Sequence, residues 1–201
     1  MKKYQIIYAD PPWRYTPAVK NRRVENHYPT MHIKDILSMK ISAEKNSVLF
    51  LWATASKLPE CLSVMGAWGF KYKSQLSWDK KIIGMGYWFR GQHELLLVGT
   101  RGRFHPPTPE NRISSVWSER RTIHSKKPDG IRMWISRCYP GFTKIELFAR
   151  ERISGWDAWG NEIKESPVLG EESAQNTVEI CHTAPNSHCM QKTQLDFEDL
   201  L

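Results

Sequence analysis

The amino-acid sequence predicts an α/β protein with a twisted, mostly parallel sheet. Short apolar runs rich in β-forming residues recur along the chain, and helical segments separate the first three of them. Glycine or proline marks the end of most of these segments. A strand–helix–strand order is typical of parallel sheets, because the helix returns the chain to the edge from which it started. The 201 residues suit one domain.

The first half of the chain alternates strands and helices. Residues 4–9 form an apolar run that stops at Asp10, which two prolines follow, so we expect a buried strand that ends in a rigid turn. Open α/β sheets bind ligands at the carboxyl ends of their strands, which is where Asp10 lies. The next predicted elements are a helix at residues 33–39, a strand at residues 47–52 and a helix at residues 58–68.

Long polar stretches separate the remaining elements. Three of them are predicted loops, because they combine glycines or prolines with basic and aromatic residues: residues 14–30, 80–92 and 103–124. The other predicted elements are strands at residues 71–78, 94–98 and 143–148 and a helix at residues 129–138.

Charge is distributed unevenly along the chain. The formal net charge is +8, but residues 162–201 hold eight acidic and two basic side chains, whereas residues 1–161 carry 27 basic and 13 acidic ones. Such a basic body is typical of nucleic-acid binding, because phosphate neutralisation releases counterions. A lysine-rich surface without a specific partner is the alternative. Residues 163–201 are acidic and polar, so we expect a flexible tail after a folded domain of residues 1–162.

The sequence gives little support to membrane, secreted or metal-binding classes. No run reaches the roughly 18 apolar residues that a membrane span needs, and the start lacks the apolar core of a signal peptide. We therefore expect a soluble, cytoplasmic protein with no membrane partner. Adjacent Cys and His residues do not match the common spacing of zinc ligands, so we expect no metal at the two such pairs, Cys181-His182 and His188-Cys189.

Asp10, Pro11, Pro12 and Trp13 form the candidate catalytic segment. We expect the carboxylate and an outward-facing Pro11 carbonyl, free of competition from the following amides, to act as hydrogen-bond acceptors. Such acceptors can hold an exocyclic amine by its hydrogens and leave its lone pair free to react. Trp13 offers a flat face to an extruded base, where stacking contributes roughly 1–3 kcal/mol. The alternative is that Asp-Pro-Pro only turns the chain after a strand.

Four segments of the sequence match known motifs in a fixed order. They are residues 9–13 (ADPPW), 86–94 (GYWFRGQHE), 125–129 (SKKPD) and 144–150 (KIELFAR), with Trp156, Gly160 and Asn161 beyond them. Together they resemble the MT-A70 family of adenine N6-methyltransferases, which includes the catalytic subunit of the mRNA adenosine methyltransferase. The likeness covers residues 4–162. It implies a Rossmann-like, S-adenosylmethionine-dependent methyltransferase fold with a circularly permuted motif order.

The resemblance implies a role for each matching residue. Asp10 and the Pro11 carbonyl would hold the target amine, and Asp10 would also lie near the amino group of S-adenosylmethionine. Glu94 and Lys127 would lie beside the target base and the methionine end of this cofactor. The residues implied for the ribose of the cofactor are Arg150 and Asn161.

The downstream residues also have ordinary structural explanations. Lys127 could be a solvated residue at a helix start, although a cation there opposes the helix dipole. Glu94 could pair with an arginine on the surface, and Asn161 could cap a loop. Glu162 stands where the family has a glutamine, which leaves its contact to the cofactor open.

The implied function is N6-methylation of adenine in nucleic acid, in the cytoplasm of a bacterium or a phage-infected cell. No zinc-finger module precedes the domain, and the chain resembles compact bacterial and phage members, which favours DNA over RNA. Arg22 and Arg23 would contact the polymer, while Trp13, Glu94 and Lys127 would contact the target base. An RNA methyltransferase and a catalytically inactive nucleic-acid-binding scaffold are the alternatives. The sequence is compatible with a monomer or a homodimer.

Overall fold

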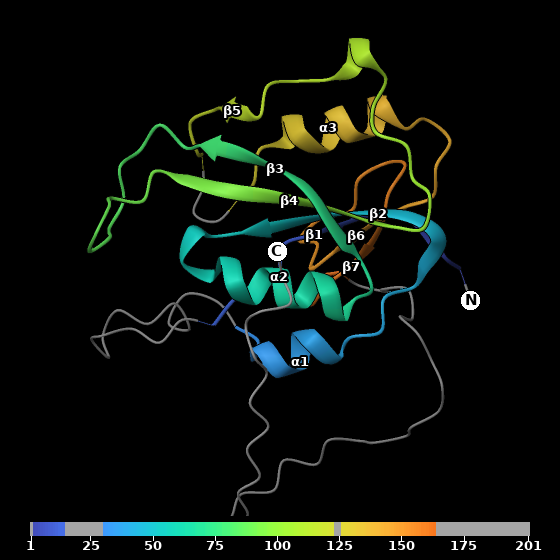
Figure 1. The fold of residues 1–201 in the computed structure, drawn as a ribbon, viewed down its shortest axis with the longest axis horizontal. Helices are drawn as coiled ribbons and strands as arrows, with labels where there is room; N and C mark the ends of the chain where they lie inside the picture. The colour runs from blue at the N-terminus through green and yellow to red at the C-terminus, as the bar shows by residue number, and fades with distance from the viewer. Residues whose placement is uncertain (1, 15–29, 123–125, 164–201) are drawn as a thin grey trace, which may run out of the picture. The chain divides into compact units, whose positions relative to one another are not determined.

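A seven-stranded sheet organises the described residues, which in this computed structural model are 2–14, 30–122 and 126–163 (Figure 1). The strand order is β5-β3-β4-β2-β1-β6-β7. The strands are β1 Tyr4–Ala9, β2 Ala43–Ala53, β3 Lys71–Asp79, β4 His93–Arg101, β5 Val116–Ser118, β6 Lys144–Leu147 and β7 Asp157–Trp159. The helices are α1 Ile33–Ser38, α2 Leu58–Ala67 and α3 Asp129–Cys138, with short 3-10 turns η3 Ala55–Lys57 and η4 Pro109–Asn111.

Only β4 runs against the direction of the other strands in this sheet. β1 pairs in parallel with β2 and β6, β7 pairs in parallel with β6, and β5 pairs in parallel with β3. β4 is antiparallel to both neighbours, β2 and β3. A strand that follows its neighbour through a loop without a crossover helix must run antiparallel to it. The predicted α/β class with a mostly parallel, Rossmann-like sheet is confirmed.

Most predicted elements are present with closely matching boundaries. β1 and α3 have the predicted bounds, and α1 and α2 each end one residue early. β2 begins at Ala43 rather than at residue 47, and β4 extends beyond both predicted ends. The three-residue strands β5 and β7 were not predicted, and β5 lies inside the segment 103–124 that was expected to be a loop. Both are short strands that pair at the edges of the sheet.

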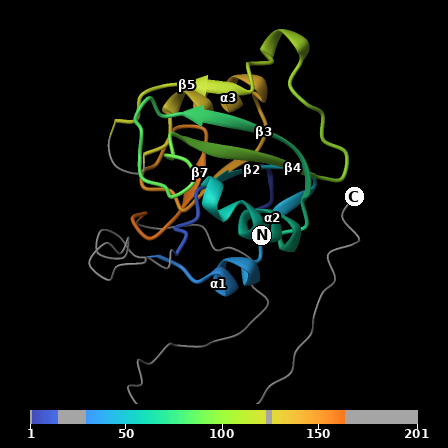
Figure 2. The same ribbon diagram turned by 60° about the vertical axis from the view of Figure 1, so that its left-hand side comes forward.

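Helices cover both faces of the central strands. Residues 47–53 of β2 are all buried, because α1 and α2 pack on one face of the sheet and α3 packs on the other (Figures 1 and 2). Val64 and Met65 of α2 belong to the first apolar cluster, and Ile131 and Ile135 of α3 belong to the second. Burial of each such side chain contributes roughly 1.5–3 kcal/mol, which anchors the helices on the sheet.

The register of the central strands brings four chain segments to one edge of the sheet. Ala9 of β1 lies opposite Leu51 of β2 and Leu147 of β6, so the residues that follow these three strands emerge together. Because β4 is reversed, its first residues lie at this same edge, where Glu94 is opposite Trp78. The carboxyl ends of β1, β2 and β6 therefore meet the amino end of β4.

The described residues all belong to one compact unit. The expected tail at residues 163–201 lies outside the described residues except for Ile163. Within the described part of the chain, no helix has the length and apolar character that a membrane crossing requires.

Candidate functional site

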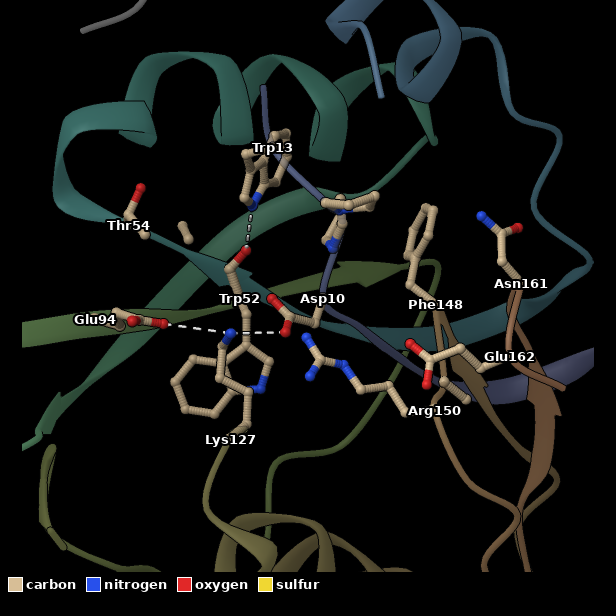
Figure 3. Close-up of a pocket in the computed structure, with 14 residues that line it drawn as sticks. Asp10, Trp13, Trp52, Thr54, Glu94, Lys127, Phe148, Arg150, Asn161 and Glu162 are labelled. Carbon is tan, nitrogen blue, oxygen red and sulfur yellow. Dashed lines mark hydrogen bonds and ion pairs between the residues drawn. The ribbon is translucent and has the colours of Figure 1, made fainter. Parts of the chain in front are cut away.

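A pocket of about 200 Å³ opens where β1, β2 and β6 end and β4 begins (Figure 3). It is lined by Asp10, Pro11, Pro12, Trp13, Trp52, Ala53, Thr54, Glu94, Lys127, Phe148, Ala149, Arg150, Asn161 and Glu162. A second cavity of about 300 Å³ shares Asp10, Lys127, Phe148 and Arg150 with it, so the two cavities are neighbours around the same side chains.

Lys127 joins the two carboxylates of the pocket. Its ammonium lies 2.6 Å from Oδ2 of Asp10 and 3.4 Å from Oε2 of Glu94 (Figure 3). The other oxygen of Glu94 receives a hydrogen bond from Nζ of Lys80 at 3.2 Å. The side chain of Lys127 is 12% exposed and that of Asp10 is 28% exposed. The alternative interpretation of Lys127, as a solvated residue at a helix start, is therefore wrong. Glu94 pairs with two lysines and not with a surface arginine.

Burial and the paired charges set the protonation of these three groups. Burial raises the pKa of Asp10 above its ordinary value, and Lys127 only partly offsets this effect. Burial alone would lower the pKa of Lys127, but Asp10 and Glu94 outweigh it and raise that pKa. Burial acts to raise the pKa of Glu94, but Lys127 and Lys80 outweigh it, so this pKa is lowered. The cluster therefore keeps Lys127 positively charged and shifts the pKa values of the two carboxylates in opposite directions, upward for Asp10 and downward for Glu94.

The turn after β1 differs from the expectation in one respect. The backbone N–H of Trp13 donates a hydrogen bond to the Pro11 carbonyl at 2.8 Å, so the prediction that no following amide competes for this oxygen is wrong. Pro12 has no amide hydrogen, but the chain turns tightly enough for the next amide to reach back. A carbonyl oxygen has a second lone pair, which leaves Pro11 able to accept one more hydrogen bond.

Trp13 serves the core as well as the pocket. Its ring is only 6% exposed, and its Nε1 donates to the carbonyl of Trp52 at 3.2 Å (Figure 3). Little of the ring is therefore open to a base. This contact fixes the turn that carries Asp10 against the end of β2.

Trp52 is a site residue that the sequence reasoning did not identify. Its indole Nε1 donates to the Tyr8 hydroxyl at 2.6 Å, and the ammonium of Lys127 lies 5.7 Å from its ring centroid. A cation over an indole face is electrostatically favourable. Trp52 and Thr54 lie at the carboxyl end of a predicted strand, so the rule that placed Asp10 at the site would also have indicated them.

The opposite wall of the pocket depends on a close backbone approach between two turns. Phe148 follows β6 with a φ of 62°, a left-handed conformation that is uncommon for a bulky side chain. The N–H of Ala149 donates to the Trp159 carbonyl at 2.9 Å, and a Cβ on Gly160 would lie 2.3 Å from the Ala149 carbonyl oxygen. Only glycine fits this position, and it brings the next residue, Asn161, to the pocket.

The structure brings together most of the residues predicted for the site. Asp10, Pro11, Pro12, Trp13, Glu94, Lys127, Arg150 and Asn161 all line the same pocket. The two predicted polymer-contacting residues, Arg22 and Arg23, lie outside the described residues, as do both Cys-His pairs. Phe148 and Glu162 also line the pocket without having been assigned a role. Their position in the sequence was the only signal for them: Phe148 lies within the motif of residues 144–150, and Glu162 directly follows Asn161.

Sequence comparisons with known proteins show the family of the chain. A sequence model of the MT-A70 family matches residues 4–162. The type II methyltransferase M.MunI of Mycoplasma sp is 31% identical over 188 residues, which cover 83% of this chain and 81% of that protein. A putative N(6)-adenosine-methyltransferase MT-A70-like protein of Medicago truncatula is 27% identical over 92% of this chain. The human N(6)-adenosine-methyltransferase catalytic subunit METTL3 is 29% identical over 80% of it. The chain spans only 31% and 28% of these two eukaryotic relatives.

Proposed function

The chain belongs to the MT-A70 family of methyltransferases, and from this premise we propose that it transfers a methyl group from S-adenosylmethionine to the N6 amine of adenine in DNA. The observation that carries the proposal is the position of Asp10. Its carboxylate lies in a pocket at the carboxyl ends of parallel strands, beside the Pro11 carbonyl and paired with Lys127. We place the reaction in the bacterial cytoplasm, because the chain matches the compact bacterial relative along most of its length.

The polar groups of the pocket fit S-adenosylmethionine. This molecule carries a carboxylate, an ammonium, a ribose diol and a sulfonium, and so it needs both cations and acceptors around it. The pocket offers Lys127 and Arg150 as cations, Asp10 and Glu162 as carboxylates, and Asn161 as an amide. The neighbouring cavity extends the space around Asp10 and Lys127. When bound, S-adenosylmethionine would supply an activated methyl group on its sulfur.

Asp10 and Pro11 supply the acceptors that an adenine amine requires. The nitrogen lone pair of this amine is conjugated into the ring, and holding the two N–H groups lets the lone pair turn out of that plane. Asp10 can accept one N–H, and the second lone pair of the Pro11 carbonyl can accept the other. Burial raises the pKa of Asp10, so this carboxylate is also suited to receive the proton that the amine loses after methyl transfer.

One relative supports DNA as the polymer. The type II methyltransferase M.MunI of Mycoplasma sp is 31% identical to this chain, and the match covers 81% of that protein. Methylation of adenosine in RNA is the second candidate, because the relatives named for adenosine methylation match 80% or more of this chain. An inactive scaffold of the same fold is disfavoured, since the Asp-Pro-Pro-Trp segment is intact and lines a pocket.

Two measurements test the proposal. Transfer of tritiated methyl groups to matched single-stranded DNA, duplex DNA and RNA should label DNA most strongly. A clear preference for RNA would contradict the choice of polymer and leave the chemistry intact. Calorimetric titration of the folded protein with S-adenosylmethionine should show binding, and the absence of binding would favour the scaffold.

A further inference from the structure

The loop between β3 and β4 exposes a concentration of apolar side chains. Tyr87, Trp88 and Phe89 are 95%, 94% and 88% exposed, and Ile83 and Met85 of the same loop are also exposed. Five of the ten exposed large hydrophobic residues in the described part of the chain lie in residues 81–91, here called the aromatic loop. Side chains of this size are ordinarily buried, and an exposed apolar patch commonly marks an interaction site.

Backbone hydrogen bonds hold the aromatic loop in its extended form. Lys80 N–H donates to the Gln92 carbonyl at 3.0 Å and Gly84 N–H donates to the Gly91 carbonyl at 2.9 Å, which closes the two arms on each other. At the tip, a Cβ on Gly86 would lie 1.9 Å from the Phe89 carbonyl oxygen, so only glycine permits this turn. The aromatic rings are thus presented to solvent by an ordered backbone.

Both ends of the aromatic loop are attached to the pocket. Glu94 follows the loop by a few residues and lines the pocket, and Lys80 precedes the loop and donates to the same carboxylate at 3.2 Å. Figure 1 shows the loop projecting from the edge of the sheet at which β3 ends and β4 begins. A polymer that delivers a base to Asp10 would therefore pass close to the aromatic loop.

The charge around the rings favours nucleic acid over an apolar partner. Arg90 and Lys81 are both exposed and lie on either side of the aromatic tip, and the ammonium of Lys81 also forms an ion pair with Asp79 at 2.9 Å. Basic side chains attract phosphates, and aromatic faces stack on bases of any sequence, a combination that is typical of proteins that bind unpaired bases. A purely apolar protein surface would gain nothing from these two cations.

We propose that Trp88, flanked by Tyr87 and Phe89, stacks on the nucleic-acid bases beside the target adenine. Removal of an adenine from its stack exposes the faces of its neighbours, and an aromatic ring can cover them. Trp13 is too deeply buried to do so, whereas Trp88 is almost fully exposed. This inference rests on the proposed function, because it assumes that nucleic acid reaches the pocket.

Fluorescence anisotropy with labelled, degenerate, adenine-containing DNA oligonucleotides tests the inference. Trp88→Ala should weaken binding roughly 5- to 150-fold, the loss that corresponds to one stacked base, and Trp88→Phe should retain most of the affinity. Arg90→Ala should reduce the slope of log K against log salt by about one, whereas Trp88→Ala should leave that slope unchanged. Met133→Ser is the matched control, because Met133 is also an exposed apolar residue but lies on α3.

Three results would overturn the inference. Wild-type protein could fail to bind any of the oligonucleotides, or Trp88→Ala could bind them as tightly as Met133→Ser does. Analytical ultracentrifugation could instead show a wild-type dimer that Trp88→Ala converts to a monomer of unchanged DNA affinity, which would assign the aromatic loop to a second copy of the chain. Calorimetry measures the binding of S-adenosylmethionine to the same proteins. This measurement distinguishes the three results from a failure of the proposed function.

Discussion

The ammonium of Lys127 lies 2.6 Å from the Asp10 carboxylate, so the group that we propose holds the target amine is paired with a cation within the protein. Lys127 also reaches Glu94, at 3.4 Å, and its ammonium lies 5.7 Å from the ring centroid of Trp52. One lysine therefore connects segments from β1, β2, β4 and the start of α3. An incoming amine must share Asp10 with Lys127 or displace it, and this competition makes both residues informative sites for mutation.

Replacement of Asp10 by Ala should strongly reduce methyl transfer and keep the fold. The change removes the proposed acceptor for the amine, and loss of one such preorganised group typically lowers turnover by about 100- to 1,000-fold. Turnover with tritiated S-adenosylmethionine and a thermal melt measure the two effects. Unchanged turnover in a folded variant would remove Asp10 from the mechanism.

Activity should fall on acidification at a higher pH than an ordinary aspartate would cause. The ionised form of Asp10 accepts the amine, and burial raises its pKa, so protonation begins at a higher pH than for an exposed carboxyl. The pH dependence of kcat/KM measures this titration in the free enzyme. A profile that stays flat down to the range of exposed carboxyl groups would contradict the assignment.

The ionised form of Asp10, which activity requires, should lower the stability of the fold. A raised pKa means that the folded state binds this proton more tightly than the unfolded state, so ionised Asp10 lowers stability above its unfolded pKa. Asp10→Asn should therefore melt at a higher temperature than wild type at neutral pH. The difference should shrink as the pH falls and Asp10 becomes protonated, and a constant difference would point to packing instead.

Replacement of Lys127 should weaken both the fold and the site. Lys127→Ala leaves the carboxylates of Asp10 and Glu94 without their shared cation, and because Asp10 is 28% exposed we expect a loss of about 2 kcal/mol, below the range for a fully buried pair. Binding of S-adenosylmethionine should weaken as well. Lys127→Met keeps a long, unbranched apolar side chain without the charge, so a similar loss in both variants assigns the effect to charge. Wild-type affinity for S-adenosylmethionine and wild-type stability in both variants would refute this role of Lys127.

Gly160 offers a test of the wall opposite Asp10. In Gly160→Ala the new methyl group would lie 2.3 Å from the Ala149 carbonyl oxygen and force apart the turns that carry Arg150 and Asn161. We expect affinity for S-adenosylmethionine to fall about tenfold, the loss that corresponds to one weakened polar contact. Gly66→Ala is the control, because nothing lies within 4 Å of a Cβ there and alanine favours helix α2 by about 0.5–1 kcal/mol. Equal affinity in the two variants would show that the wall tolerates displacement.

The strands that form the core were predictable because their side chains are buried on both faces. β1 is apolar except for Gln5, and the prolines after Asp10 fix its end. The prediction missed the first residues of β2. The side chains of Glu44, Lys45 and Asn46 are at least partly exposed, so this part of the strand has no apolar pattern. β5 and β7 contain three residues each, and pairing with distant strands, rather than local pattern, makes them strands.

The site was predictable where chemistry and motif coincide. Asp10, Glu94 and Lys127 were expected near one another, but the ion pair between Glu94 and Lys127 depends on the reversed direction of β4, which was not predicted from the sequence. The hydrogen bond from Trp13 to the Pro11 carbonyl and the burial of the Trp13 ring depend on how tightly the turn closes. Such features follow from tertiary packing and not from residue type.

The identity of the methylated product tests the central proposal most directly. Adenine-containing DNA incubated with the protein and S-adenosylmethionine should yield N6-methyladenine when the digested nucleosides are analysed by mass spectrometry, and Asp10→Ala should form it about 100- to 1,000-fold more slowly. A folded wild-type protein that binds S-adenosylmethionine but methylates another base, or an Asp10→Ala variant that produces N6-methyladenine at the wild-type rate, would contradict the account.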